Sequence, residues 1–435
     1  MKISKGGAGR KRPSPGLFIT LVSVILYCLL VWLTVRPVAG WYAVGKADEK
    51  GLIKAARYDS GDAVYPYLLG RYYSLNLENP DPARAISYYR RALALSPLQP
   101  GAWVGLSRSL LNEGRTSEAE YALERAVLLN PSDGNLMWKA STFWLMNGKV
   151  DKAVAALRRF ILADPEGQLS VYDLCWKLKL DNSYLVRNLL PHEYPYERKY
   201  LEYLIAAKRP AEAEEVWDLI DKNTVDRDLF VRYVNFLIDG GLYDRAEKDW
   251  RQVAIKAAGL KSGGSLPLIW NPDFENEILN GGFDWSVGEA GGVDVFIDDS
   301  VHVTGNRSLG VSFNGEENPD VTIARQVVRT RPGARYTLRA YVKTNSLTTT
   351  NGIFLSVEGH RCTGLSRRSD TVSGTNFWRE VTVDFEVPQD CYAAIVKIRR
   401  ERSNKLDNKI AGTAWIDGLS LKEQAGTVTT ASGKP

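Results

Sequence analysis

Apolar residues in the middle of the chain recur three and four positions apart, which places them on one face of an α-helix. Three such runs, ALALSP, AVLLNP and FILADP, end at Pro97, Pro131 and Pro165, and these prolines are 34 residues apart. A single pair of helices cannot bury its own apolar face, so this period predicts pairs of helices stacked on one another. We therefore expect an α-α solenoid in this part of the chain.

The clearest repeat resembles the tetratricopeptide family. Its matching residues are Trp103, Leu106, Leu110, Ala119, Leu123 and Ala126, followed by Pro131. The unit before it fits with an insertion around residues 79–82, and a weaker repeat returns where Ala213 and Trp217 recur as Ala246 and Trp250. The resemblance implies a tetratricopeptide-like solenoid of about five or six helical hairpins over residues 40–258.

Stacked repeats of this kind curve and form a concave surface that binds protein partners. The repeat register projects six residues onto that surface: Tyr67, Arg71, Val104, Arg108, Trp138 and Thr142. The alternative is that some of these side chains only cover neighbouring helices. We expect a protein partner to bind in this groove.

The periodicity changes near residue 257. The segment KSGGS at residues 261–265 is typical of a flexible linker, which we place at residues 259–268. Runs such as RYTLRAYVK at 335–343 then alternate polar and apolar residues, with turn residues between them. This alternation predicts an all-β sandwich over residues 269–423, followed by a small, polar, disordered tail at 424–435.

Several pieces of the β region resemble the jelly-roll carbohydrate-binding modules and their galactose-binding-like relatives. The pieces are NPDFE at 271–275, NGGFDW at 280–285, GNRSL at 305–309, RPGARY at 331–336 and GTAWIDGLSL at 412–421. The resemblance implies a jelly-roll sandwich with Trp285, Trp378 and Trp415 in its core. Tyr341, Phe354, Arg361 and Tyr392 remain as candidates for contact with glycan.

The same resemblance implies a structural calcium ion. Modules of this type bind it through an acidic residue of the opening motif and another near the last strand, which corresponds here to Glu275 or Asp284 together with Asp417. Oxygen ligands of this kind suit calcium. The alternative is that the carboxylates cap turns or pair with arginines. We expect no other cofactor.

Residues 17–35, LFITLVSVILYCLLVWLTV, are uncharged and apolar, and their length approaches the roughly 20 residues that span a bilayer as a helix. Five positive and no acidic residues precede them, a bias that holds the N-terminus in the cytoplasm. We expect a basic cytoplasmic tail at 1–16, a transmembrane helix at 17–36 in the inner (cytoplasmic) membrane, and a periplasmic or extracellular bulk. The alternative is a signal peptide cleaved near the small residues at 38–40.

The net charge of +5 is accounted for by that tail, because the rest of the chain is formally neutral. A phosphate-binding face needs basic residues on a folded surface, so we expect no nucleic-acid partner. The chain has three histidines and no nucleophile elbow, P-loop, dinucleotide or zinc-protease motif. Acidic pairs such as Asp298 and Asp299 are explained as charged turns, and we expect no enzyme.

Four cysteines occur, at positions 28, 175, 362 and 391. Cys362 and Cys391 lie near predicted strand ends in the same β region, and in an oxidising compartment they would form a disulfide. The alternative is two buried free thiols.

Two functions remain. The first is a membrane-anchored exported scaffold that binds proteins through its groove, with a sandwich that contacts glycan or a second protein. The second is a glycan-binding accessory factor for envelope or exopolysaccharide assembly or export, an interpretation that rests on the family resemblance alone.

Overall fold

The computed structural model describes residues 15–45, 48–76, 80–257, 267–406 and 408–424. The chain divides into two compact units, Met1–Pro191 (unit 1) and His192–Pro435 (unit 2). The predicted basic tail lies outside the described residues up to residue 14, as do most of the predicted linker and the C-terminal tail after Gln424.

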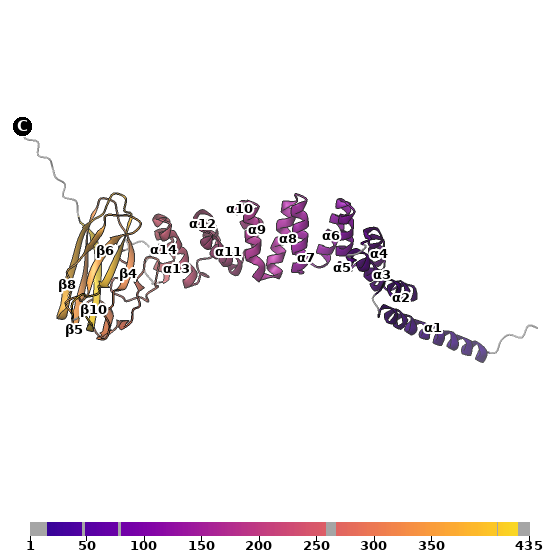
Figure 1. The fold of residues 1–435 in the computed structure, drawn as a ribbon, viewed down its shortest axis with the longest axis horizontal. Coiled ribbons are helices and arrows are strands. Elements are labelled where there is room, and N and C mark those ends of the chain that lie inside the picture. The colour runs from indigo at the N-terminus through magenta and orange to yellow at the C-terminus, as the bar shows by residue number, and fades with distance from the viewer. Residues whose placement is uncertain (1–14, 46–47, 77–79, 258–266, 407, 425–435) are drawn as a thin grey trace, which may run out of the picture. The chain divides into compact units, whose positions relative to one another are not determined.

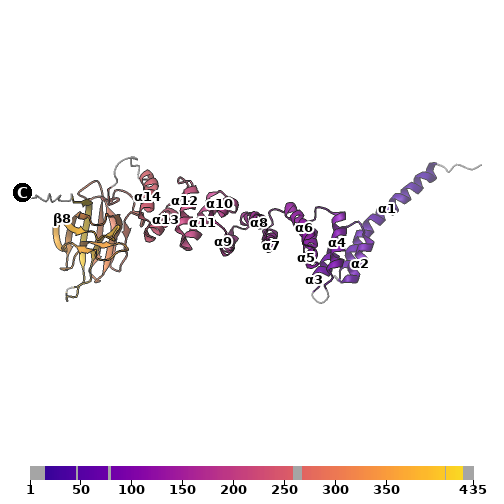
Figure 2. The same ribbon diagram turned by 90° about the horizontal axis from the view of Figure 1, so that it is seen from above.

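Unit 1 is helical, and its helices α3 to α8 follow one another as pairs in Figure 1 and Figure 2. Two of these helices begin where the sequence supplies a helix cap: Asp81 before α4 and Asp133 before α7 accept hydrogen bonds from the backbone N–H groups of Arg84 and Leu136. The described helices are α1 (Pro15–Val44), α2 (Glu49–Tyr58), α3 (Val64–Leu75), α4 (Pro82–Leu95), α5 (Pro100–Asn112), α6 (Thr116–Leu129), α7 (Gly134–Met146), α8 (Val150–Ala163), α9 (Gln168–Lys177) and α10 (Asn182–Asn188).

Glycine allows the close approach of α3, α4 and α5. The ring of Tyr89 on α4 lies between Gly70 and Gly105, and a methyl group added at Gly105 would meet that ring at 2.2 Å. Tyr89 is fully buried, and its hydroxyl lies 3.0 Å from the hydroxyl of Ser74. The glycines therefore let one large aromatic side chain bind three helices together.

Helix α1 is the described helix that is long and apolar enough to cross a membrane, over Ile19–Val44. Its side chains from Ile19 to Val35 are exposed, as expected of a surface that faces lipid. Beyond that stretch, the Arg36 side chain donates a hydrogen bond of 2.7 Å to the carbonyl oxygen of Tyr58, and Gly40 packs against the Tyr65 ring. Beyond its exposed stretch, α1 therefore packs against α2 and α3.

Unit 2 begins with four helices: α11 (Tyr194–Ala206), α12 (Pro210–Leu219), α13 (Arg227–Asp239) and α14 (Tyr243–Ala257). Stacked aromatic rings join the last three of them. Trp217 lies 4.2 Å from Tyr233 between ring centroids, and Phe230 lies 5.3 Å from Trp250. The recurrence of Trp217 at Trp250 thus places two tryptophans in one continuous core.

An antiparallel β-sandwich follows. Sheet A has the order β1-β4-β9-β6-β7 and sheet B the order β2-β3-β10-β5-β8. Alternating residues such as Leu338, Ala340 and Val342 fill the core between the sheets. The strands are β1 (Ser286–Val287), β2 (Val293–Asp298), β3 (Ser308–Asn314), β4 (Val321–Arg329), β5 (Arg335–Leu347), β6 (Phe354–Gly359), β7 (Ser366–Arg368), β8 (Gly374–Glu386), β9 (Ala393–Arg400) and β10 (Ala411–Glu423).

Two of the three tryptophans predicted for the sandwich core are not in it. Trp285 is fully buried, but Trp378 and Trp415 are only half-buried. Trp415 alternates with Ala414 and Ile416, which point inward, so its ring faces outward from sheet B, where its indole N–H donates to Asp298 at 2.7 Å. Trp378 lies in the part of β8 where the pairing with β5 shifts register.

The last helical pair packs directly on the sandwich within unit 2. Trp250 meets Trp270 and Phe283 edge-on, with ring centroids 5.7 and 6.1 Å apart. Gly282 approaches so closely that an added methyl group would lie 2.2 Å from the Trp250 ring. Pro267, in the last part of the predicted linker, lines one small cavity together with Trp250. The helices and the sandwich therefore share an apolar contact.

Candidate functional sites

A cavity of about 590 Å³ opens among helices α3, α4, α5 and α7 in unit 1. Four of the six predicted groove residues line it: Tyr67, Arg71, Val104 and Arg108. They meet because helices in neighbouring repeats present the same register to the same side. Sequence reasoning missed Asn130 and Asp133, which line the cavity from the turn before α7, where helical periodicity gives no signal.

Two arginines line this cavity together with one carboxylate, Asp133, whose oxygens accept hydrogen bonds from the Asn130 side chain and the Leu136 N–H. The Arg71 guanidinium lies 5.9 Å from the centroid of the Tyr67 ring, which is itself 6.2 Å from Tyr89. Among the described residues, neither Arg71 nor Arg108 has an ion pair with a carboxylate. Burial raises the pKa of Tyr89, and the two guanidinium groups oppose that shift, which places both charges beside the cavity wall.

The other two predicted groove residues, Trp138 and Thr142, do not line this cavity. The Trp138 ring packs against Phe160 at 5.2 Å between centroids, and the Thr142 hydroxyl donates to the Trp138 carbonyl at 3.0 Å. Trp138 thus covers the neighbouring helix α8, which is the alternative role expected for some of these residues.

The carboxylates expected to hold calcium bind backbone N–H groups instead. Asp417 accepts from Val303 and Thr304 at 2.7 and 2.8 Å, and Glu275 accepts from Asn306 and Arg307 in the same loop. Asp284 lies apart from that loop. No group of three metal-ligating side chains occurs among the described residues. These carboxylates therefore have the turn-capping role named as the alternative, and calcium binding there stays a prediction.

Asp284 is buried, and its two oxygens accept hydrogen bonds from the backbone N–H groups of Leu279 and Trp285, both at 2.7 Å. Burial raises the pKa of Asp284 to about 6, although the two N–H groups pull it down. The carboxyl group therefore holds the turn before β1 at a cost in desolvation.

The four glycan candidates lie in different places. Tyr341 is exposed on sheet B, whereas Phe354 is buried on sheet A. Arg361 donates to the carbonyl oxygen of Asp239 on α13, and Tyr392 is exposed in the loop before β9. The structure does not bring them together into one site.

Cys362 and Cys391 are joined by a disulfide, with Cα atoms 5.3 Å apart. It links the loop after β6 to the loop before β9. Cys175 is a buried free cysteine in α9, and burial raises the pKa of its thiol to about 12. That thiol is therefore unreactive at neutral pH.

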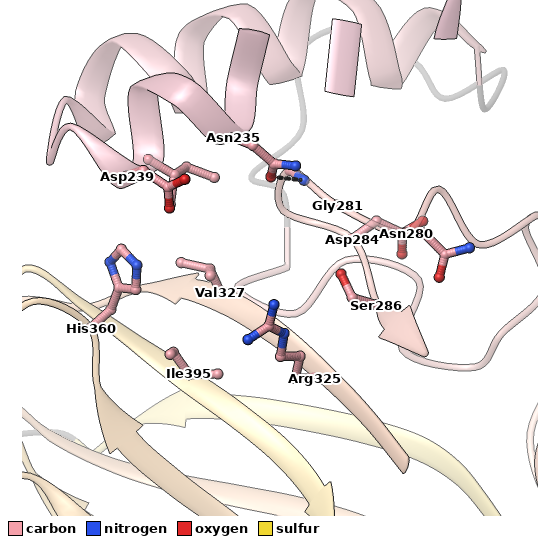
Figure 3. A pocket seen from close by; sticks show the side chains of 12 residues that line it. Asn235, Asp239, Asn280, Gly281, Asp284, Ser286, Arg325, Val327, His360 and Ile395 are labelled. Atoms are coloured by element: carbon pink, nitrogen blue, oxygen red, sulfur yellow. Dashed lines mark hydrogen bonds between the residues drawn. The ribbon is translucent and has the colours of Figure 1, made fainter. Parts of the chain in front are cut away.

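A second, polar cavity of about 230 Å³ lies in unit 2 between α13 and sheet A (Figure 3). Sequence reasoning missed it entirely. Helix α13 and the turn before β1 form one wall, and strands β4 and β9 with the residue after β6 form the other. Its lining includes Asn235, Ile238, Asp239, Asn280, Ser286, Arg325, Val327, His360 and Ile395.

Residues 77–141, which include α4, α5 and α6, match the family model of the tetratricopeptide repeat. The chain carries tetratricopeptide repeats. No curated protein matches it.

Solved structures resemble each part of the chain. PilF of Pseudomonas aeruginosa is 15% identical with a TM-score of 0.27, over 52% of this chain and 94% of its own. A xylan-binding domain of carbohydrate-binding module family 22 is 15% identical with a TM-score of 0.27, over 38% of this chain and 100% of its own. The active domain of tailspike protein 4 from bacteriophage CBA120 is 16% identical with a TM-score of 0.27, over 36% of this chain. The match covers only 21% of that tailspike chain.

Proposed function

We propose that the protein is a non-enzymatic, membrane-anchored scaffold whose tetratricopeptide groove binds an acidic segment of a protein partner. The main support for this proposal is that Arg71 and Arg108 line one cavity and that, among the described residues, neither has a carboxylate partner. Arginine binds carboxylates through two parallel hydrogen bonds, so two such groups beside Tyr67 suit Asp and Glu side chains of an extended peptide.

The anchor is α1. Its exposed apolar stretch supports a transmembrane helix, and the bond from Arg36 to the Tyr58 carbonyl supports an uncleaved one, because cleavage at residues 38–40 would remove that contact. The N-terminus would lie in the cytoplasm of the inner membrane and the rest would lie in the periplasm or outside the cell. A reporter fused after Pro435 should then be active only outside the cytoplasm, and release of a form beginning near Trp41 would contradict the anchor.

The groove is tested with the full chain in detergent and short peptides rich in Asp and Glu. The triple variant Tyr67→Ala, Arg71→Ala, Arg108→Ala should lose binding, and added salt should weaken the wild-type complex. A matched variant, Tyr58→Ala, Arg91→Ala, Arg159→Ala, changes exposed residues that do not line the cavity and should bind normally. Equal binding of the Asn and Gln versions of the peptides would contradict a role for charge.

A glycan-binding role in envelope or exopolysaccharide assembly or export is the second candidate. The observation that favours it is the polar cavity of unit 2, whose lining offers both donors and acceptors of hydrogen bonds. Titration of the full chain with bacterial polysaccharides separates the two functions, because the groove variant above leaves this cavity intact.

A further inference from the structure

Two charged groups face the polar cavity of unit 2 without partners. Among the described residues, the Asp239 carboxylate and the Arg325 guanidinium take part in no hydrogen bond and no ion pair, although both line the cavity. Figure 3 shows Asp239 on the helix and Arg325 on the strand of the opposite wall. These two charges are of opposite sign. Asp284 also lines the cavity, but both of its oxygens already accept hydrogen bonds from backbone N–H groups.

Uncharged polar groups complete the lining. Asn280 uses its side-chain oxygen to accept from Val287 N–H, and Asn235 uses its own to accept from Gly282 N–H, so both keep their NH₂ groups for a ligand. Nδ1 of His360 lies 2.7 Å from the Tyr243 hydroxyl, so the other ring nitrogen, Nε2, stays available to a ligand. Ser286 adds a hydroxyl group. The lining therefore offers both donors and acceptors of hydrogen bonds.

Apolar side chains lie between these polar groups. Ile238 comes from α13, Val327 from β4 and Ile395 from β9. A ligand for this lining has C–H faces and hydroxyl edges, which is the chemistry of a sugar ring. The volume of about 230 Å³ is below the roughly 300 Å³ at which pockets for drug-sized ligands begin, so it suits one ring rather than several.

The two walls are held in place and the mouth is open. Tyr243 binds His360, Arg361 binds the Asp239 carbonyl, and Asn235 binds Gly282 N–H at 2.8 Å. Walls that are already fixed reduce the entropy lost on binding. Asp239, Asn280 and Arg325 are exposed, so a ligand reaches them from solvent.

We infer that this composite cavity binds a single neutral sugar ring, with vicinal hydroxyl groups shared between Asp239 and Arg325. The inference rests on the second candidate function and names its site and ligand class. It is independent of the groove of unit 1. A zwitterionic amino acid would pair with the two charges but would leave most of the amide and hydroxyl groups unused.

The test uses the full chain in detergent and ligand-observed NMR. The probes are D-glucose, D-galactose, D-mannose, L-rhamnose and N-acetyl-D-glucosamine, with D-glucuronate and L-alanine as charged comparisons. Asp239→Asn and Arg325→Ala are compared with Asp294→Asn and Arg379→Ala, which change exposed side chains outside the cavity. Thermal unfolding of each variant checks that it is folded.

At least one neutral sugar should bind the wild type. Each cavity variant should bind that sugar at least about tenfold more weakly, since each substitution removes a charge-assisted hydrogen bond. The two control variants should bind as the wild type does. Binding of D-glucuronate or L-alanine alone, or of no neutral sugar, overturns the inference. A polysaccharide that binds the wild type and both cavity variants equally leaves the glycan function standing but overturns this site.

Discussion

The Tyr243 hydroxyl and Nδ1 of His360 lie 2.7 Å apart, although the two residues are 117 positions apart in the sequence. The bond joins the first turn of α14 to the loop after β6. Burial lowers the pKa of His360, so the imidazole is neutral at pH 7. This hydrogen bond and the packing of Trp250 against Trp270 and Phe283 hold the helices and the sandwich of unit 2 together.

Tyr243→Phe should lower the free energy of unfolding of unit 2 by about 1 kcal/mol, because it leaves a half-buried imidazole nitrogen without its partner. Tyr392→Phe is the matched control, since it removes the hydroxyl of an exposed tyrosine. Thermal unfolding followed by tryptophan fluorescence measures both. Equal midpoints for the two variants would show that the bond adds nothing.

Asp284 should make unit 2 less stable as the pH rises. Its pKa is about 6 in the folded state and about 3.9 in the unfolded state, so the folded protein holds an extra proton between these values. This stabilisation is complete below pH 4 and is lost as the pH passes 6, with a change of about 3 kcal/mol at most. Compared with the wild type, Asp284→Asn should therefore gain stability between pH 4 and pH 7.

Asp294→Asn, which removes one exposed carboxylate on β2, controls for the loss of a charge. Unfolding midpoints at both pH values give the comparison. If the stability of Asp284→Asn relative to the wild type is the same at pH 4 and pH 7, the buried carboxyl group does not titrate as stated.

Alkylation under denaturing, non-reducing conditions should modify two of the four cysteines, Cys28 and Cys175, because Cys362 and Cys391 are bonded to each other. If the protein is reduced before alkylation, all four cysteines should be modified. Replacing both bonded residues with serine should lower stability by on the order of 3 kcal/mol, since the bond closes a loop of 29 residues. Mass spectrometry of the purified protein counts the modified cysteines, and four modified cysteines without reduction would refute the bond.

Gly105→Ala should destabilise unit 1 by about 1 to 3 kcal/mol, because the methyl group would meet the Tyr89 ring at 2.2 Å. Helix propensity alone predicts the opposite, a gain of about 1 kcal/mol. Gly134→Ala in α7 is the control, since its methyl group would meet its neighbours at ordinary distances from 3.6 Å. Adding Tyr89→Leu should reduce the cost of Gly105→Ala, and purely additive effects would contradict the steric explanation.

The sequence predicted the repeats and brought together four residues that line the cavity of unit 1, because both depend on local periodicity. The spacing of Pro97, Pro131 and Pro165 gave the helical pairs, and the register then placed Arg71 and Arg108 on one side. Trp138 was assigned to the groove by the same register, but the Phe160 ring offered it a closer apolar contact. Register gives the direction of a side chain, and only packing decides whether it is covered.

The cavity of unit 2 could not be predicted in this way. Asp239, Arg325 and His360 come from three separate elements, and no motif links a helix end to two strands of a sheet. The carboxylates predicted to hold calcium were chosen from a family motif. A motif specifies which residues occur at a position, but it does not specify what their side chains contact. Asp417 and Glu275 do converge on one loop, where they bind its N–H groups.

The contact of Trp250 with Trp270 and Phe283 also bears on how the solenoid ends. Stacks of helical repeats need a terminal element that covers the last apolar face, and a polar capping helix often serves this purpose. Here the sandwich covers that face, so the last repeat depends on a domain that is synthesised after it. A chain truncated after α14 would expose Trp250, and during synthesis this repeat would gain its full stability only once the sandwich had folded.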